Sequence, residues 1–526
     1  RAEGNPFYLE QLVEYILSHA ADADDVLELP ASLHSLVLSR IDAQPEDSRR
    51  AVKVASVVGR DFHTRVVAAA YPDLGLEDAV HQDLLAAATT RLIALEDPLD
   101  RAWAFGHAVT RDVAYDSLPF STRSVLHGRV GDALENEPNG PRRHLDLLAY
   151  HYSRSDDLPK KRFYLWEAAG AARATYAQET AIAYLEALLP IAEPEHRHDV
   201  LLRLAEALTI GGDWAAAEDA VARARASAEK AGDTAGVAHA RVARAELARK
   251  QGRYAEAEAE LVAAELAFFQ VDDVAGRGQV LHLRGTLESQ QGHTAPARAA
   301  YEESMALRRD LGDEAGVAAM LTNLALVAED EGDLEEAERL GRAGLDRRRA
   351  LDDRRAVSVS LTNMGMLATV RGDLPLARER FLEAQSLAEE VGDPWVVAVG
   401  RHNLANVSRD LGDLGPAASD FRVALDAYVA RDDRWSLAHV FEDIACWSLA
   451  VGESGDVDAV FLLAAAERLR GEIGAPRFPP TEAALDDALA PARHRTTQDD
   501  LDAAYAEGTA AGLTESCRRA TAVVAG

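Results

Sequence analysis

The chain has 526 residues, of which 48% are apolar, so it is long enough for several domains with sizeable cores. Its formal net charge is −32, which opposes nonspecific binding to nucleic acid or anionic membranes and suits either a halophilic cytoplasm or an ordinary acidic surface. The only cysteines are Cys446 and Cys517, and no signal peptide or membrane-length apolar run is visible, so we expect a cytoplasmic protein without a disulfide framework.

The first 45 residues predict two amphipathic helices, one from Phe7 to His19 and one from Ala31 to Asp42. An acidic segment that ends in Leu29-Pro30 separates them. The sequence opens on Arg1 instead of a methionine, from which we expect that further sequence precedes it.

Residues 46–137 predict a small domain of helices followed by a β-hairpin. The helix Glu46–Val58 is followed by two shorter helices. The apolar runs 91–95 and 102–105 flank a turn at 97–100 and predict two antiparallel strands. Helices followed by such a two-stranded wing are typical of a winged-helix domain. Because its surroundings are acidic, we do not expect this domain to read DNA.

From about residue 198 onwards, aspartates and glycines recur every 40 residues, and each aspartate stands just before a new apolar run. The aspartates are Asp233, Asp273, Asp313, Asp353, Asp393 and Asp433, and the glycines are Gly212, Gly252, Gly292, Gly332, Gly372, Gly412 and Gly452. A period of this length is the sequence signature of a solenoid built from two-helix units. Solenoids present a long concave face to a partner, so this half of the chain predicts a recognition device.

The unit around Gly332 shows how the period arises. The run 318–328 is rich in helix formers, and Gly332 follows where a helix needs a left-handed C′ residue. Asp333 then predicts the N-cap of a second helix that ends near Leu351, and Glu336, three residues later, predicts a capping box.

Small residues recur in three rows where the paired helices must touch. One row is Ala205, Ala245, Gly285, Ala325, Gly365, Ala405 and Ala445, a second runs from Ala217 to Ala417, and a third runs from Ala224 to Ala464. These rows resemble tetratricopeptide repeats, in a longer version whose helices each gain part of a turn.

The resulting prediction is an all-α fold, in which a winged-helix domain with a small β-wing precedes a right-handed tetratricopeptide-repeat solenoid. About seven repeats occupy residues 198–475. Residues 138–197 are expected to be a divergent helical repeat or linker, and residues 476–526, which break the period, a helical C-terminal cap.

The first helix of each unit is expected to direct a set of side chains into the concave groove. This set is Glu246, Arg249, Lys250, His282, Gln290, Glu329, Asp330, Thr362, Met366, Val370, His402, Asn406 and Arg409. An apolar strip flanked by hydrogen-bond donors suits a peptide or protein segment better than a small metabolite. Asn406 and Arg409, one helical turn apart, would grip a peptide backbone or a carboxylate. The recurrent Asn323, Asn363 and Asn403 are interpreted as structural.

Two motifs resemble the signal-transduction ATPases with numerous domains. Residues 3–12, Glu-Gly-Asn-Pro-Phe-Tyr-Leu-Glu-Gln-Leu, look like the Gly-x-Pro motif of that family, and residues 105–115, Phe-Gly-His-Ala-Val-Thr-Arg-Asp-Val-Ala-Tyr, resemble its winged-helix histidine motif. The stretches 148–152 and 474–480 also look like members fused to cyclase, kinase or transcription-activator effectors. With this resemblance, residues 1–45 become the end of the helical lid region of an ATPase.

The resemblance implies a nucleotide-dependent switch. Family members hold ADP in a closed state, which places Pro6 against the adenine and His107 near the β-phosphate, with Gly4 allowing a close backbone approach. Signal binding to the repeats then lets ATP, with magnesium, replace ADP. His107 has a plain alternative as a packed core residue, and Pro6 as the first residue of a helix.

The sequence departs from the family because no G-x-x-x-x-G-K-[ST] phosphate loop occurs. We therefore expect no enzyme activity, no metal site and no cofactor bound by this chain alone, and we expect an ATPase core and an effector upstream. Two alternatives stay open: a stand-alone tetratricopeptide-repeat scaffold for protein–protein interaction, and the regulatory half of a nucleotide cyclase.

Overall fold

The computed structural model describes residues 32–174, 177–391, 394–452, 455–473, 477 and 479–525. The predicted helix Phe7–His19 and the motif residues Gly4 and Pro6 lie outside them. The chain divides into two compact units. The first extends to residue 171 and includes 183–192, and the second comprises 172–182 and everything from 193 onwards.

The first unit is mainly helical, with one small sheet. Its helices are α2 (Leu33–Asp42), α3 (Glu46–Val58), α4 (Thr64–Ala70), η1 (Pro72–Leu74), α5 (Glu77–Ala88), α6 (Ala108–Asp116), α7 (Phe120–Glu135), α8 (Gly140–Arg143), α9 (Leu145–Ser153), most of α10 (Leu158–Ala174), the end of α11 (Gln178–Leu188) and η2 (Leu189–Ile191). The helix predicted at Glu46–Val58 is found with those bounds.

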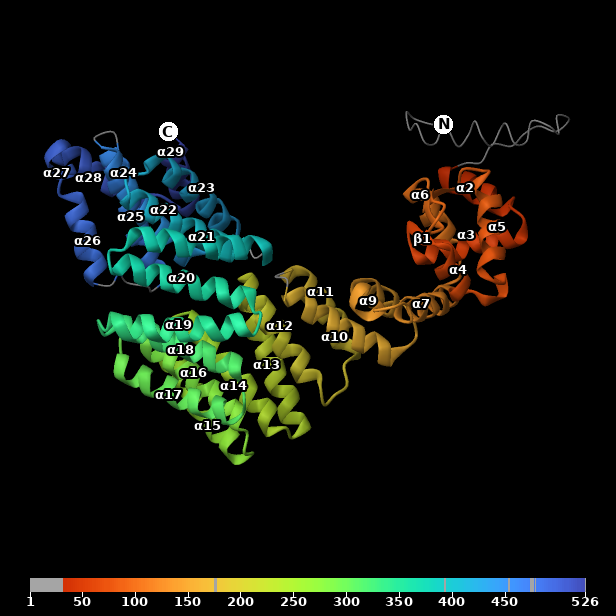
Figure 1. Cartoon of the computed structure of the whole chain (residues 1–526), viewed down its shortest axis with the longest axis horizontal. Coiled ribbons are helices and arrows are strands. Elements are labelled where there is room, and N and C mark those ends of the chain that lie inside the picture. Colours follow the sequence, from red (N-terminus) through yellow and green to blue (C-terminus); the bar gives the residue numbers. More distant parts are fainter. Residues whose placement is uncertain are drawn as a thin grey trace. The chain divides into compact units, whose positions relative to one another are not determined.

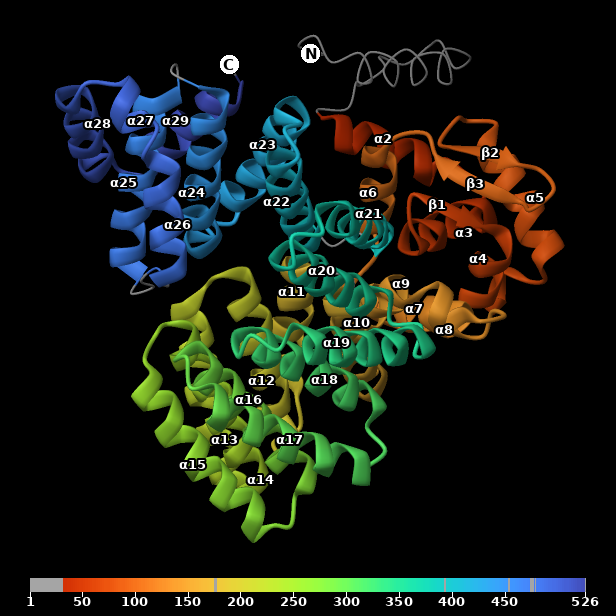
Figure 2. The same ribbon diagram turned by 60° about the vertical axis from the view of Figure 1, so that its left-hand side comes forward.

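The sheet of the first unit has three strands, β1 (Asp61–His63), β2 (Ile93–Asp97) and β3 (Ala102–Phe105), in the order β1-β3-β2 with both pairs antiparallel (Figure 2). The predicted hairpin corresponds to β2 and β3. Strand β1 was not predicted, because three residues are too few to show the alternation of a strand. It pairs Phe62 with Trp103 and so covers the second edge of β3.

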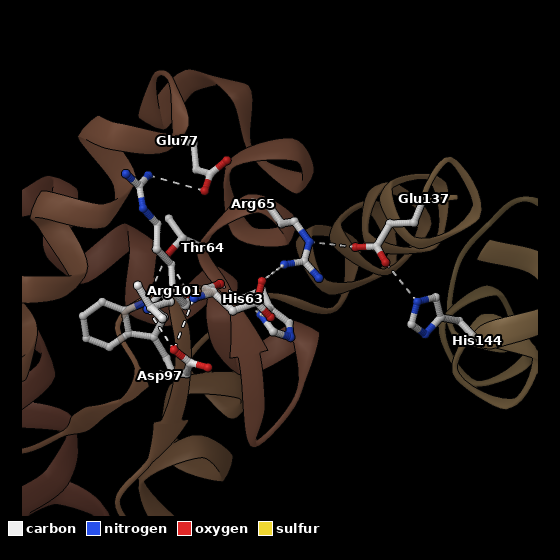
Figure 3. Close-up of polar contacts among 11 residues, drawn as sticks. His63, Thr64, Arg65, Glu77, Asp97, Arg101, Glu137 and His144 are labelled. Atoms are coloured by element: carbon white, nitrogen blue, oxygen red, sulfur yellow. Dashed lines mark hydrogen bonds and ion pairs between the residues drawn. The ribbon is translucent and has the colours of Figure 1, made fainter. Parts of the chain in front are cut away.

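The tip of the hairpin is fastened by polar side chains (Figure 3). A carboxylate oxygen of Asp97 accepts hydrogen bonds from backbone N–H groups within the turn. The guanidinium of Arg65, on α4, donates to Asp100 at 3.1 Å and to Glu137, just after α7, at 3.0 Å. Glu137 in turn lies 3.0 Å from the Nε2 of His144. These contacts hold the hairpin against the end of α7.

Helices α9 and α10 belong to the core of the first unit. Tyr152 and Tyr164 are buried, stack at 5.0 Å between ring centroids, and lie in the same apolar cluster as Trp103 of β3. A Cβ added at Gly131 of α7 would lie 2.7 Å from the ring of Tyr152, so only glycine allows this approach. Most of the segment predicted as a repeat or linker, residues 138–197, therefore packs with the N-terminal helices.

The second unit stacks seven helix pairs in the described residues, running from yellow to blue in Figure 1. The first helices are α12 (Arg197–Gly211), α14 (Thr234–Lys250), α16 (Val274–Gln290), α18 (Glu314–Asp330), α20 (Arg354–Val370), α22 (Pro394–Asp410) and α24 (Arg434–Val451). The second helices are α13 (Trp214–Ala231), α15 (Tyr254–Gln270), α17 (Thr294–Asp310), α19 (Leu334–Ala350), α21 (Leu374–Val391), α23 (Leu414–Ala430) and α25 (Asp456–Ile473).

The helix ends follow the predicted glycine and aspartate period, with one difference. Gly332 has φ +82° after α18, and the side chain of Asp333 accepts a hydrogen bond from the backbone N of Glu336 at 3.0 Å. The capping box predicted there is only half formed, because the carboxylate of Glu336 binds the guanidinium of Arg339. An arginine one turn along the helix is a stronger partner for a carboxylate than a backbone amide.

The small-residue rows lie where paired helices touch. Ala337 and Ala377 are 1% and 0% exposed. A Cβ added at Gly365 of α20 would lie 2.5 Å from the ring of Phe381 on α21. The size of these residues therefore sets the distance between the two helices of a pair.

Successive first helices contact one another more extensively than successive second helices do. The first helices therefore line the inner, concave face of the stack, and the second helices form its outer face.

The C-terminal end of the second unit is closed by α26 (Pro479–Leu489), α27 (Ala492–Arg495), α28 (Gln498–Ala510) and α29 (Leu513–Ala525). Helix α28 packs on α25, and α29 contacts α23, α24 and α25. In the described part of the chain, no helix is both long and apolar enough to cross a membrane.

Candidate ligand-binding groove

Each first helix from α14 to α24 leaves the same four positions on its inner face out of the core. In α20 these are Val359, Asn363, Met366 and Val370, spaced as one face of a helix requires. Met366 and Val370 are 44% and 59% exposed. Apolar side chains with this exposure in the middle of a concave face form a surface that an apolar part of a ligand can cover.

One of the predicted groove residues points elsewhere. Thr362 is 8% exposed, and its hydroxyl donates to the backbone oxygen of Ser358 at 3.0 Å. The position forty residues later, His402, is 9% exposed. This register lies between neighbouring helices, because it is one residue out of phase with the inner face at 363 and 403.

The groove side of α14 carries a cluster in which one carboxylate pairs with two cationic side chains. Arg249 donates two hydrogen bonds to Glu246, at 2.7 and 2.8 Å, and the Nζ of Lys250 lies 3.7 Å from the same carboxylate. The three predicted residues are therefore brought together, and they present one net positive charge.

His282 of α16 lies deeper in the wall of the groove. Its Nε2 is 3.0 Å from the amide nitrogen of Asn323 on α18, which assigns that ring nitrogen as the acceptor. Burial, together with the charge of Arg308, lowers the pKa of His282 to about 4, so the ring is neutral at pH 7. Asn323 thus joins two adjacent repeats, in agreement with its structural interpretation.

The ends of α16 and α18 place polar groups at one rim of the groove. Gln290 and Asp330 are exposed, and Glu329 is partly buried. Burial raises the pKa of both Glu329 and Asp330, with the neighbouring carboxylates adding to the effect. Glu329 also lines a cavity of about 20 Å³ with Asn363 and Met364, which has room for one water molecule but not for a ligand.

His402, Asn406 and Arg409 of α22 converge on one carboxylate, that of Asp443 on α24. The Nε2 of His402 lies 2.8 Å from its Oδ2, and the amide nitrogen of Asn406 donates to the same oxygen at 3.0 Å. Arg409 donates to the Oδ1 of Asn406 at 3.0 Å and lies 3.6 Å from the Oδ1 of Asp443.

Asp443 therefore occupies the donors that were expected to grip a ligand. Burial alone would raise its pKa, but the hydrogen bond and charge of His402, with Arg409 and Asn406, lower it well below the usual range of a carboxyl. The side chain keeps 29% exposure, so it remains part of the groove surface.

Sequence reasoning missed Asp443, although a signal existed. The register that holds Asn323, Asn363 and Asn403 holds an aspartate in the last repeat. The amide nitrogen of Asn403 is buried and has no hydrogen-bond partner within the described residues. A change to aspartate after three consecutive repeats with asparagine at this position marks the repeat where the network is built.

In the first unit, His107 directly precedes α6 and is exposed, so the alternative of a packed core histidine is wrong. The other residues expected near the nucleotide, Gly4 and Pro6, lie outside the described residues. Across the described ranges, no cluster of three or more histidine, cysteine, aspartate or glutamate side chains could hold a metal ion.

The sequence of residues 316–390 matches the family model for the tetratricopeptide repeat. No curated protein matches the chain. Among solved structures, a signal transduction ATPase with numerous domains from Pyrococcus horikoshii, which has a tetratricopeptide repeat sensor, is 12% identical, with a TM-score of 0.42, over 96% of this chain and 70% of that one.

Two further structures are similar over shorter parts. A Rap protein in complex with competence and sporulation factor is 15% identical, with a TM-score of 0.44, over 70% of this chain and 99% of its own. BtubC from P. vanneervenii is 22% identical, with a TM-score of 0.36, over 42% of this chain and 91% of its own. Because the superpositions are this loose, the assignment stands on the family model and on the helix pairs themselves: residues 316–390 are tetratricopeptide repeats, and the pairs on either side continue their 40-residue period.

Proposed function

We propose that the repeats bind an extended peptide or protein segment on their inner face and that the chain is the sensor and regulatory part of a signal-transduction ATPase. The observation that carries the binding role is the exposed strip of Met366 and Val370 on the inner face of α20, within repeats that match the tetratricopeptide family. The charged cluster of α14 and the acidic end of α18 lie in the repeats that precede that strip.

The chemistry of the groove limits what it accepts. Arg409 and Asn406 already bind Asp443, so a ligand carboxylate would have to displace that side chain. A ligand with an apolar residue over Met366 and backbone groups facing Asn363 meets no such competition. The segment bound is therefore expected to contribute apolar side chains and main chain more than negative charge.

This role is tested with a library of fluorescent random peptides about ten residues long. Anisotropy should reveal peptides that bind the chain in the micromolar range, and Met366→Glu and Val370→Glu should each weaken that binding about tenfold or more. Leu382→Glu, at a 53% exposed position on the outer helix α21, serves as the matched control. Equal binding by all variants would place the site elsewhere.

The regulatory role rests on the first unit. We propose that residues 46–137 are a winged-helix domain, a proposal supported by the order α3, β1, α4, α5, β2, β3 and by the antiparallel sheet β1-β3-β2. His107 lies two residues after the end of β3 and is exposed, so it is accessible to a nucleotide held by an upstream core. ADP or ATP with magnesium would be bound by that core, because this sequence has no phosphate loop.

The test is calorimetric titration of ADP into the full-length gene product. Tight binding that weakens with His107→Ala supports the switch, with His107→Gln as the variant that keeps a hydrogen-bond donor. If the intact protein does not bind ADP, the alternative of a stand-alone repeat scaffold takes its place. A cyclase domain upstream of Arg1 would identify the chain as the regulatory half of a nucleotide cyclase.

A further inference from the structure

The outer face of the solenoid offers an internal comparison between repeats. Each second helix from α13 to α23 exposes five positions in one row, spaced four, three, four and three residues apart. In α15 these are Ala255, Ala259, Val262, Leu266 and Phe269, which we call the α15 stripe. The equivalent rows of α13, α17, α19, α21 and α23 each contain at least two charged residues, whereas the α15 stripe contains none.

The three large members of the α15 stripe are well exposed. Val262, Leu266 and Phe269 are 54%, 61% and 68% exposed. One exposed leucine is ordinary on a protein surface, but three apolar side chains on consecutive turns form a continuous patch. The other second helices pack in the same way with charged residues at these positions. The stability of the repeat therefore does not require apolar residues in the α15 stripe.

The surroundings of the stripe are acidic on one side. Glu258 and Glu265 flank it there and share the single guanidinium of Arg284 on α16, at 3.3 and 2.9 Å, so the three groups carry one net negative charge. The ring of Phe269 at the end of the stripe has the guanidinium of Arg277 at 5.7 Å from its centroid. A partner helix complements such a surface when its own apolar face covers the stripe and its lysines or arginines lie beside the glutamates.

We propose that the α15 stripe docks an amphipathic helix of a partner protein, with apolar residues in its seam and basic residues on its flanks. The stripe from Ala255 to Phe269 spans about 21 Å, which matches about four turns of a partner helix. A second copy fits less well, because two chains of net charge −32 repel each other.

This surface is distinct from the inner groove, so its test can fail without affecting the proposed function. The probe is a fluorescent synthetic helix of about 15 residues, with leucines in the seam and lysines on the flanks, measured by anisotropy against the whole chain. Leu266→Glu and Val262→Glu should each weaken its binding at least tenfold. Leu382→Glu, which stands at the register of Val262 in α21 with 53% exposure, should bind as the wild type does. Met366→Glu in the groove should also leave binding unchanged.

Several results would overturn the proposal. They are absence of binding by the wild-type chain, equal weakening by Leu382→Glu or Met366→Glu, and equal binding of a peptide with glutamates in place of the lysines. Sedimentation should show a monomer; a concentration-dependent dimer that Leu266→Glu abolishes would make a second copy the occupant. Circular dichroism of each variant confirms folding, which these exposed positions do not control.

Discussion

The Nδ1 atoms of His127 and His151 lie 2.9 Å apart in the core of the first unit, on α7 and α9, and both rings are buried. The Nε2 of His127 lies 2.9 Å from the hydroxyl of Tyr115 on α6. Two ring nitrogens this close share one hydrogen bond, so the ring that accepts it must be neutral. The two histidines can therefore link α6, α7 and α9 only while at least one of the two rings is neutral.

Burial, with the nearby guanidiniums of Arg154, Arg111 and Arg123, lowers the pKa of His127 to about 4. Burial and the charge of His127 lower the pKa of His151 to about 3. Both values lie below the ordinary 6.5. As the pH falls, these histidines therefore take up protons in the unfolded chain before they do so in the folded one. The free energy of unfolding is highest above pH 6.5, where both rings are neutral in both states, and it decreases progressively towards pH 4.

We predict that the first unit loses about 2 kcal/mol per imidazole between pH 7.5 and pH 5. Hydrogen exchange of α6, α7 and α9 at the two pH values measures this loss. His127→Gln, which keeps a hydrogen-bonding side chain but does not titrate, should show a smaller loss. His107→Gln, at an exposed position, should behave as the wild type. A loss of equal size in all three proteins would assign the acid sensitivity to other groups.

The small-residue rows between paired helices predict that larger side chains there will destabilise the solenoid. Ala337 is 1% exposed at the contact between α18 and α19, and a leucine there has no room without moving a helix. Ala337→Leu should destabilise the chain by roughly 1–3 kcal/mol, and so should Ala377→Leu in α21. Ala350→Leu, at the exposed end of α19, is the control expected to change little. Thermal melts compare them, and an unchanged melt for Ala337→Leu would contradict the packing register.

The period of the repeats could be predicted because it follows from local chemistry repeated many times. Gly332 must adopt φ +82° and Asp333 must cap α19, and each requirement selects a residue type at a fixed position. The paired helices then follow from the apolar runs between these ends. Strand β1 has no such signal, because its three residues gain their conformation from pairing with β3.

The details of the groove could not be read from the sequence. The 40-residue period gives the register of each helix only to about one residue, and one residue is enough to turn Thr362 into the core. The convergence of His402, Asn406 and Arg409 on Asp443 joins two repeats, which depends on how the repeats stack. The buried pair His127 and His151 likewise depends on tertiary packing between helices that are separate in sequence.

Helix α17 lacks the aspartate cap found on α13, α19 and α21, which predicts a route to higher stability. The residue before α17 is His293, and its side chain makes no cap hydrogen bond, whereas the side chain of Asp333 accepts one at 3.0 Å. His293→Asp should stabilise the repeat by about 0.5–1 kcal/mol, and Asp333→Ala should cost about 1 kcal/mol. Urea denaturation followed by circular dichroism measures both. If His293→Asp destabilises instead, the contact between His293 and Glu288 is worth more than the cap.

The C-terminal end of the solenoid depends on a buried carboxylate. Glu442 of α24 is 4% exposed, and it accepts two hydrogen bonds from Arg470 of α25, at 2.8 Å each, and one from Arg477 at 2.6 Å. Glu442→Gln removes the buried negative charge with which both guanidiniums pair. Breaking a buried pair in this way costs about 3–5 kcal/mol, whereas Glu472, whose side chain is 41% exposed, should contribute at most about 1 kcal/mol through its pair with Arg468.

Because each repeat contacts only its neighbours, the loss should stay local. Hydrogen exchange of α24, α25 and α28 should accelerate in Glu442→Gln while exchange in α14 to α18 stays unchanged, and Glu472→Gln should change neither. Uniform acceleration along the whole solenoid would mean that the stack unfolds as one cooperative body, in which case the carboxylate of Glu442 would stabilise the entire unit instead of its C-terminal end.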